Sequence, residues 1–366
     1  MIVKFFSEKK KAKKISSEIQ KNVKNMLGSG QYTNAKYVKK FENNFGKYFN
    51  SKYCIAVNNG TSALHLSLLA LKIKKGDEII VPSMTFIASA AAINYVGAKP
   101  IFVDVNENDW LINSNLIEKY ITKKTKAIMV VHLHGLMCDM DKIKKIATKY
   151  KLKLIEDAAQ THGSLYKNKP PGYFSDVATF SFYPTKNLGA VGEGGAILTN
   201  NKDIFEKTKR MRTWSHKKND FFEIGFNYRM TEFSAISLLA KLKFLKNDIK
   251  KRIMIAKKYK ENLKIETFSN FNEKIKKHSY HIFAIKVNAK RRTKIMAALK
   301  SKGIDTNIHY PYNLSELNVF NKKRATTNSP VSQKISKEFL SLPIYPELDI
   351  KKILYTCKIL NQIIGK

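Results

Sequence analysis

Lys186 is the residue whose type and surroundings most directly suggest chemistry. It lies in the run FSFYPTKNLGAVGEGG, at 180–195, after a strand-like stretch and before a glycine-rich turn. A lysine held between tightly packed segments loses hydration, which lowers the pKa of its amine and frees it to attack a carbonyl. Lys and Arg together number 67 in this chain, so most of them must be surface charges. Lys186 therefore needs supporting residues before it counts as a nucleophile.

A second candidate is Asp157, which ends the apolar run KLKLIED at 151–157. A carboxylate at this position can pair with a protonated ring nitrogen and keep it charged, and Gln160 can hydrogen-bond a neighbouring oxygen. The alternative is that Asp157 caps the turn that follows.

The run NNGTSALHL, at 58–66, passes from a strand through Gly60 into a helix that opens with Thr61 and Ser62. Backbone amides and hydroxyls at the N-terminus of a helix suit a phosphate group. The alternative is that Thr61 or Ser62 is an ordinary helix cap.

Three further residues complete the constellation. Phe86 would stack on a flat ring if it faces the same cleft, although most phenylalanines are core residues. Ser181 could add a hydroxyl to the same phosphate, and Asn227 is a polar residue within the aromatic run GFNYRM. A buried amide needs hydrogen-bond partners, and the alternative for Asn227 is a turn residue. Together, the amine, the carboxylate, the flat aromatic and the phosphate cradle describe a site for pyridoxal phosphate, whose ring acts as an electron sink.

The elements that must position these residues follow an alternating pattern. Strand-like runs lie at 53–58, 78–82, 99–105, 127–133, 151–157, 177–183 and 195–200, with helical stretches at 61–71 and 140–150. Continuous apolar strands that alternate with helices predict a mostly parallel sheet covered on both faces, an α/β domain. Ligands bind at the carboxyl ends of the strands in such sheets, where the candidate residues fall.

The second half of the chain predicts a smaller α+β domain. Two amphipathic helical stretches, at 231–246 and 248–264, look like a connection between the domains. The stretches that follow are strand-like at 278–288, helical at 289–303 and proline-punctuated at 310–346, before a last helix that ends near Ile364. We predict a large domain over 1–245, including an N-terminal arm, and a small domain over 246–366.

The net charge of +38 at pH 7 could attract a polyanion. However, the lysines are spread along the whole chain, and arginine, which nucleic-acid readers favour, occurs only seven times. We therefore expect no nucleic-acid partner.

No apolar run suggests a signal peptide or membrane span, and the three separated cysteines Cys54, Cys138 and Cys357 suggest neither disulfides nor zinc. A cytoplasmic location is expected.

A metal site is the alternative for His132 and His134, which precede Asp139 and Asp141. Strand-end and helix-capping roles account better for these residues, because the two aspartates stand where a helix begins. We predict no metal site, and we expect His162 to be a structural histidine.

Six ordered runs, VNNGTSALHLSLLAL, GDEIIVPSMTFIASAAAINYVGAKPIFVDV, TKAIMVVHLHG, IEDAAQTHGS, FSFYPTKNLGAVGEGGAILTN and GFNYRMTEFSAI, resemble the DegT/DnrJ/EryC1/StrS family. Its members are pyridoxal-phosphate-dependent aminotransferases of nucleotide sugars. The resemblance implies a fold-type I transferase and a homodimer with shared active sites. It also implies that glutamate donates an amino group to a keto group on a nucleotide-linked 6-deoxyhexose, in amino-sugar or surface-glycan biosynthesis.

The same resemblance implies a role for each candidate. Lys186 would carry the cofactor as an aldimine, and Asp157 would pair with the pyridine nitrogen. Gln160 would lie near the 3-hydroxyl, and Phe86 would stack on the ring. The phosphate would be held by the turn at Gly60 with Thr61, Ser62 and Ser181, and by Asn227 from the other subunit. Two alternatives stay open: a dehydratase of the same fold, in which histidine replaces the lysine in the family, and a basic binding or regulatory protein without catalysis.

The chain departs from the family pattern in two places. Asn59 and Ser62 stand where the phosphate turn of the family commonly has serine and alanine, and backbone donors would survive this change. Many relatives carry a histidine near Ser315, in a loop that faces the sugar. The nucleotide, the sugar and the choice between C3 and C4 are therefore not predicted.

Overall fold

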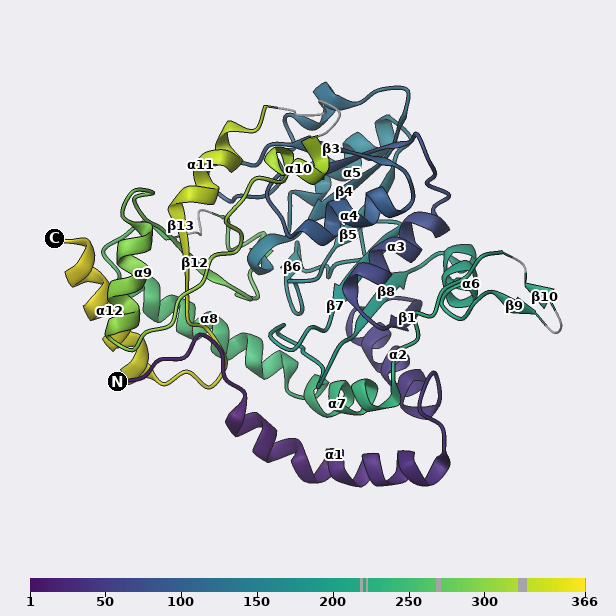
Figure 1. Ribbon diagram of the computed structural model, residues 1–366, viewed down its shortest axis with the longest axis horizontal. Helices are drawn as coiled ribbons and strands as arrows, with labels where there is room; N and C mark the ends of the chain where they lie inside the picture. Colours follow the sequence, from purple (N-terminus) through teal and green to yellow (C-terminus); the bar gives the residue numbers. More distant parts are fainter. Residues whose placement is uncertain (218–219, 222, 268–270, 322–327, 366) are drawn as a thin grey trace.

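A seven-stranded sheet forms the centre of the computed structural model, which describes residues 1–217, 220–221, 223–267, 271–321 and 328–365 (Figure 1). Its strand order is β1-β8-β7-β5-β4-β2-β3. The strands are β1 (Tyr53–Val57), β2 (Glu78–Pro82), β3 (Lys99–Val103), β4 (Thr125–Val131), β5 (Lys153–Asp157), β7 (Val177–Ser181) and β8 (Gly195–Thr199). Each strand predicted between residues 53 and 200 is present.

The prediction of a mostly parallel sheet is confirmed, with β8 as the reversed strand. β8 pairs antiparallel with both β1 and β7, while the remaining pairs are parallel. Parallel pairing needs a long crossover, usually a helix, and the loop 182–194 between β7 and β8 contains none. The chain therefore turns back beside β7, and the carboxyl ends of the other strands meet at one edge of the sheet.

Helices cover both faces of this sheet. α3 (Gly60–Ala70), α4 (Ile87–Tyr95) and α6 (Lys202–Met211) pack on one face. α5 (Met140–Lys149) covers the β4 side of the other face, and α2 (Lys36–Tyr48) with α7 (Glu232–Leu242) covers the β1 side. Successive strand residues alternate between the two cores, because side chains of a strand point to opposite faces.

The N-terminal arm joins both halves of the molecule. Helix α1 (Lys9–Ser29) lies along α7 (Figure 1). Ahead of it, Val3 is fully buried in the core of the C-terminal half, and its backbone N–H donates to the Gly303 carbonyl at 2.8 Å. The first residues therefore stabilise a unit from which they are distant in sequence.

The C-terminal half mixes helices and strands, as the pattern predicts. α8 (Leu245–Asn262) leads into an antiparallel pair, β12 (Phe283–Lys286) and β13 (Phe339–Leu342), packed with α9 (Arg292–Ser301) and α12 (Ile350–Ile364). α8 begins at the predicted domain boundary, and we retain 1–245 and 246–366 as a proposed division. Residues 322–327 of the proline-punctuated region lie outside the described residues.

Several short elements complete the chain. They are η1 (Ile117–Tyr120), η2 (Leu133–Gly135), β6 (Leu165–Tyr166), β9 (His216–Lys217), β10 (Asp220–Phe221), β11 (Lys276–Lys277), η3 (Leu314–Glu316), α10 (Asn318–Asn321) and α11 (Pro330–Glu338). Within the described ranges, no helix combines the length and the apolar character that crossing a membrane requires.

Candidate active site

A cavity of about 450 Å³ opens at the edge of the sheet where the parallel strands end. Seven of the predicted site residues line it: Gly60, Thr61, Phe86, Asp157, Gln160, Ser181 and Lys186. They follow or end the strands β1, β2, β5 and β7, which are separated in sequence and adjacent at this edge. The cavity is therefore assembled by the sheet rather than by one local segment.

Lys186 follows β7 on the loop that leads to β8, and its backbone N–H donates to the Tyr183 carbonyl at 2.9 Å. Its Nζ makes no hydrogen bond or ion pair with any residue that the structure describes. Burial lowers the pKa of Lys186 to about 8, and the charge of Asp157 partly opposes this shift. A pKa near 8 leaves about one-tenth of the amine unprotonated at pH 7, and this neutral form is the one that acts as a nucleophile.

Asp157 is buried at the end of β5, where its carboxylate accepts two hydrogen bonds. The Ser89 hydroxyl donates to Oδ2 at 2.8 Å, and the Ala159 N–H donates to Oδ1 at 3.1 Å. Burial raises the pKa of Asp157, while these two donors and the Lys186 charge act in the opposite direction. The local bond to Ala159 is the turn-capping contact expected as the alternative role, but the side chain also faces the cavity.

The N-terminus of α3 is capped by Asn59 rather than by Thr61 or Ser62. The Asn59 side chain accepts from the Ser62 N–H at 2.8 Å, which leaves the two hydroxyls free of the capping role. A Cβ on Gly60 would lie 2.8 Å from the Ser181 Cβ. Only glycine therefore lets this helix end approach β7, and the close approach forms a concave anion site.

Two predicted residues lie elsewhere. Ser62 is buried and lines a neighbouring cavity of about 550 Å³, which shares Thr61 with the first. Asn227 is exposed and lines neither cavity, so its prediction as a buried amide is wrong. The segment around Asn227 pairs with Thr213 and holds its side chain outward.

Gln160 is held in one orientation. Its Oε1 accepts from the His134 N–H at 2.5 Å, and its Nε2 donates to the Tyr310 hydroxyl at 3.1 Å. The amide keeps a second N–H for an oxygen in the cavity.

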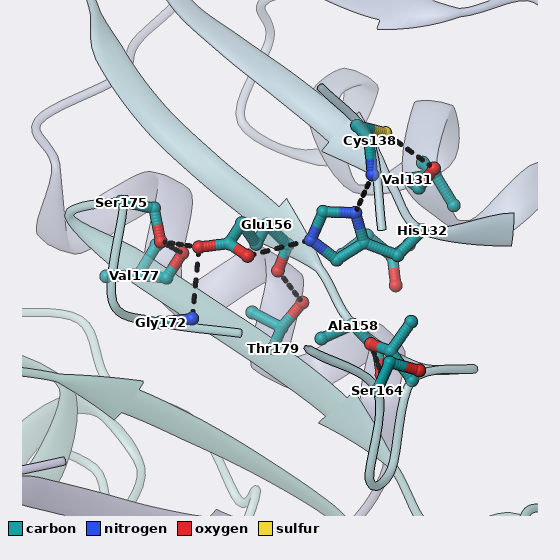
Figure 2. Close-up of polar contacts among 12 residues, drawn as sticks. Val131, His132, Cys138, Glu156, Ala158, Ser164, Gly172, Ser175, Val177 and Thr179 are labelled. Carbon is teal, nitrogen blue, oxygen red and sulfur yellow. Dashed lines mark hydrogen bonds and ion pairs between the residues drawn. The ribbon is translucent and has the colours of Figure 1, made fainter. Parts of the chain in front are cut away.

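A buried hydrogen-bond network links His132, the residue after β4, to Glu156, which precedes Asp157 in β5 (Figure 2). His132 Nδ1 accepts from the Cys138 N–H, so the proton of the neutral ring is on Nε2, which donates to Glu156 at 2.7 Å. The Gly172 N–H and the Ser175 hydroxyl donate to the other oxygen of Glu156. These bonds stabilise the strand ends that carry Asp157.

The histidines that superficially resembled metal ligands are engaged in this framework. His132 bonds Glu156, His134 bonds the His309 carbonyl at 2.9 Å, and Asp139 caps α5. The residues described by the structure contain no group of three or more potential metal ligands. His162 is fully buried between Phe180 and Phe182, as a structural histidine would be.

Several residues that line the cavity were not predicted from the sequence. Ser89 lies in the first turn of α4, three residues after Phe86, which precedes the helix in extended conformation. His281, His309 and Tyr310 come from the C-terminal half, and no spacing in the sequence places them here. Ser315, near which many relatives carry a histidine, is buried against Asn313 and does not line the cavity.

These residues fit pyridoxal phosphate. The Gly60 approach provides an anion site at a helix N-terminus, and Asp157 provides a buried carboxylate for a protonated ring nitrogen. Phe86 is 49% exposed and lines the cavity, so its face is available to a flat ring. Lys186 provides an amine with lowered pKa.

Comparisons with known proteins agree with this arrangement. Residues 13–361 match the DegT/DnrJ/EryC1/StrS aminotransferase family. The chain is 39% identical over 351 residues to a dTDP-3-amino-3,6-dideoxy-α-D-galactopyranose transaminase from Aneurinibacillus thermoaerophilus, covering 94% of this chain and 95% of that protein. It is 38% identical over 331 residues to the GDP-perosamine synthase of Escherichia coli O157:H7, and the match covers 89% of this chain and 90% of that protein.

Solved structures extend the similarity to the whole fold. The crystal structure of S. venezuelae DesV in complex with a ketimine intermediate superposes with a TM-score of 0.95 at 32% identity, covering 100% of this chain and 99% of that one. The structure of NtdA from Bacillus subtilis with bound cofactor PMP has a TM-score of 0.89 at 32% identity, and the match covers 96% of this chain and 82% of that one. The predicted fold class, family and cofactor are confirmed.

Proposed function

We propose, from the premise that the chain belongs to the DegT/DnrJ/EryC1/StrS aminotransferase family, that it aminates a nucleotide-linked keto sugar. The amino group comes from an amino acid, which we take to be glutamate, and the acceptor is a keto group of a 6-deoxyhexose. The enzyme depends on pyridoxal phosphate, and the product is a nucleotide-linked amino sugar that serves amino-sugar or surface-glycan biosynthesis.

The observation that carries this proposal is that Lys186 and Asp157 line one cavity, where the pKa of Lys186 is lowered and the pKa of Asp157 is raised. Burial favours the neutral amine at Lys186 and raises the pKa of Asp157, while each charge opposes the shift of the other. A neutral amine and a carboxylate in one enclosed site are the two groups that proton transfer next to a protonated heterocycle requires.

Each residue then has a defined task. The bound cofactor supplies the electron sink for the carbon that loses its proton. Lys186 holds the cofactor and moves a proton at the reacting carbon, first of the amino acid and then of the sugar. Asp157 keeps the ring nitrogen protonated, and Ser181 and Thr61 hold the phosphate. Lysine at position 186, where the dehydratases of the family carry histidine, favours amino transfer over dehydration.

The two relatives named above support the acceptor class but not one nucleotide. One name contains GDP and the other dTDP, although each joins the nucleotide to an amino sugar. We therefore propose a nucleoside-diphosphate sugar and leave the base and the aminated carbon to experiment.

We also propose that the enzyme is a homodimer with shared active sites. Asn227 is exposed and outside the cavity of its own chain, so its side chain is free to reach a second copy. Tyr95, Tyr183 and Val191 are exposed large apolar side chains, and the first two line the main or the neighbouring cavity. Covering such a surface would stabilise a dimer.

The test offers the purified, cofactor-loaded enzyme a panel of 3-keto and 4-keto 6-deoxyhexoses linked to GDP, dTDP or UDP, with glutamate. We expect one acceptor to be aminated, as detected by mass spectrometry, and 2-oxoglutarate to form in equal amount. The Lys186→Ala variant should keep the fold and lose turnover by at least about 10³-fold, because it lacks the amine. Water loss from the sugar without use of glutamate would instead identify a dehydratase.

A further inference from the structure

The segment 279–282 belongs to the C-terminal half of the chain, and its residue His281 lines the cavity. The Ser279 N–H donates to the Gly135 carbonyl at 2.9 Å, and the Ser279 carbonyl accepts from the Asn187 amide at 3.1 Å. The Ile282 N–H donates to the His134 carbonyl at 3.2 Å. The backbone on both sides of His281 is thus fixed to the large sheet, next to the loop of Lys186.

The side chain of Arg252 also hydrogen-bonds this segment. It is fully buried on α8, and its Nη1 donates to the Tyr280 and Ile344 carbonyls at 3.0 Å and to the His281 carbonyl at 3.5 Å. A guanidinium enclosed against carbonyls in this way holds the chain in a single path. His281 therefore stands on a rigid support.

The ring of His281 has no such engagement. It is 7% exposed and lines the cavity, yet it makes no hydrogen bond with any residue that the structure describes, and its Nδ1 is enclosed without a partner. Two other polar side chains that line the cavity have hydrogen-bond partners within the chain. Gln160 bonds Tyr310, and His309 bonds Ser341 at 2.9 Å. A buried polar group left unpaired costs free energy. His162 also has ring nitrogens without a partner, but His281 differs from it in lining the cavity, where a ligand can pair with its ring.

The charge state of His281 limits what it can do. Burial holds the pKa of His281 well below its usual range, and the Lys186 charge lowers it further. The ring is therefore neutral at pH 7. It can donate one hydrogen bond through its N–H, but it cannot serve as a protonated acid there.

We propose that His281 is a substrate-contacting residue whose N–H holds the α-carboxylate of the amino donor, an inference that rests on the proposed function. Among the described residues that line the cavity, Lys186 is the one lysine or arginine, so a carboxylate bound there by this chain depends on neutral donors. The α-carboxylate is bonded to the carbon that Lys186 deprotonates. It must therefore lie beside Lys186, where the unpaired ring of His281 is located.

The test compares His281→Leu with His281→Gln in the cofactor-loaded enzyme. The probe is glutarate, which has the two carboxylates of glutamate but no amino group and cannot react. His281→Leu should weaken glutarate binding about 10- to 100-fold, the range for a lost hydrogen bond to a charged group, and should raise the KM for glutamate similarly. His281→Gln keeps an N–H and should stay within about 5-fold of the wild type. Affinity for pyridoxal phosphate should not change in either variant.

A matched control is His278→Leu, which alters the buried histidine immediately before this segment, a residue that does not line the cavity. It should lower stability and leave glutarate binding unchanged. The inference is overturned if His278→Leu weakens glutarate binding as much, if His281→Leu binds glutarate like the wild type, or if only the sugar half-reaction suffers. Because glutarate binding needs no turnover, this result is independent of the sugar panel, whose failure would count against the proposed function alone.

Discussion

At the scale of single residues, Lys186 and Asp157 are the pair to which we assign the chemistry. Each loses hydration in the cavity, and desolvation disfavours the charged form of both. Their opposite charges act against that penalty, as do the Ser89 and Ala159 donors at Asp157. The lowered pKa of about 8 suits the amine to the proton transfers that we propose for it.

We predict that Asp157→Asn lowers the pKa of Lys186 in the apoenzyme below about 8, because the carboxylate charge that raises it is gone. The pH dependence of the rate of cofactor capture measures this shift. The variant should still bind pyridoxal phosphate and should lose at least about 10²-fold in turnover, since the ring nitrogen loses its anionic partner. Asp139→Asn keeps a helix cap outside the cavity and should behave like the wild type. An unshifted Lys186 in Asp157→Asn would refute the coupling.

At the scale of elements, the contact between the start of α3 and the end of β7 shapes the anion site. Gly60 and Ser181 belong to segments 121 residues apart, and the sheet order places β8 between β1 and β7. A side chain at position 60 would collide with backbone and Cβ atoms of Ser181. The close approach of α3 to β7, where we propose that the phosphate binds, thus depends on the absence of one Cβ.

Gly60→Ala should weaken binding of pyridoxal phosphate by about 10-fold or more, because α3 must move away from Ser181 to relieve a 2.8 Å contact. A titration followed by visible absorbance gives the affinity. The control is Gly28→Ala in α1, where a Cβ meets nothing within 4 Å. That change should leave cofactor binding intact and stabilise the fold by about 0.5–1 kcal/mol. Equal cofactor affinity in both variants would contradict the role given to Gly60.

At the scale of the whole molecule, buried histidines cluster where the two halves of the chain meet. Burial lowers the pKa of His134 to about 4 and those of His162 and His309 to about 3, and it holds those of His278 and His281 well below the usual range. These rings stay neutral when folded, whereas in the unfolded chain they take up protons near pH 6.5. The unfolded state therefore binds more protons than the folded state below pH 6.5, and acid favours unfolding.

Stability should thus be highest above pH 6.5 and should fall steadily as the pH drops from 6.5 toward 4, as measured by urea denaturation at a series of pH values. His162→Phe removes one of these groups from between Phe180 and Phe182 and should reduce the slope of this curve. His216→Gln alters an exposed histidine and should leave the slope unchanged. A wild-type curve that stays flat between pH 6.5 and 4 would contradict this account.

The sequence by itself determined the strands, their order along the chain and the residues that follow them, because apolar runs and helix periodicity are local properties. Lys186, Asp157 and the turn at Gly60 are recognisable for the same reason. Their meeting in one place could be expected only in outline, from the rule that parallel strands end at a common edge.

Only the tertiary structure decided the rest. The reversal of β8, the Asn59 cap and the contact of Gly60 with Ser181 depend on how separate segments pack. His281 and His309 line the cavity although they lie 95 and 123 residues beyond Lys186. The segment of His281 is held by backbone bonds of Ser279 and Ile282 to carbonyls, together with bonds from the Asn187 and Arg252 side chains. Backbone hydrogen bonds carry no residue-specific signal, so the wall they build becomes visible only in three dimensions.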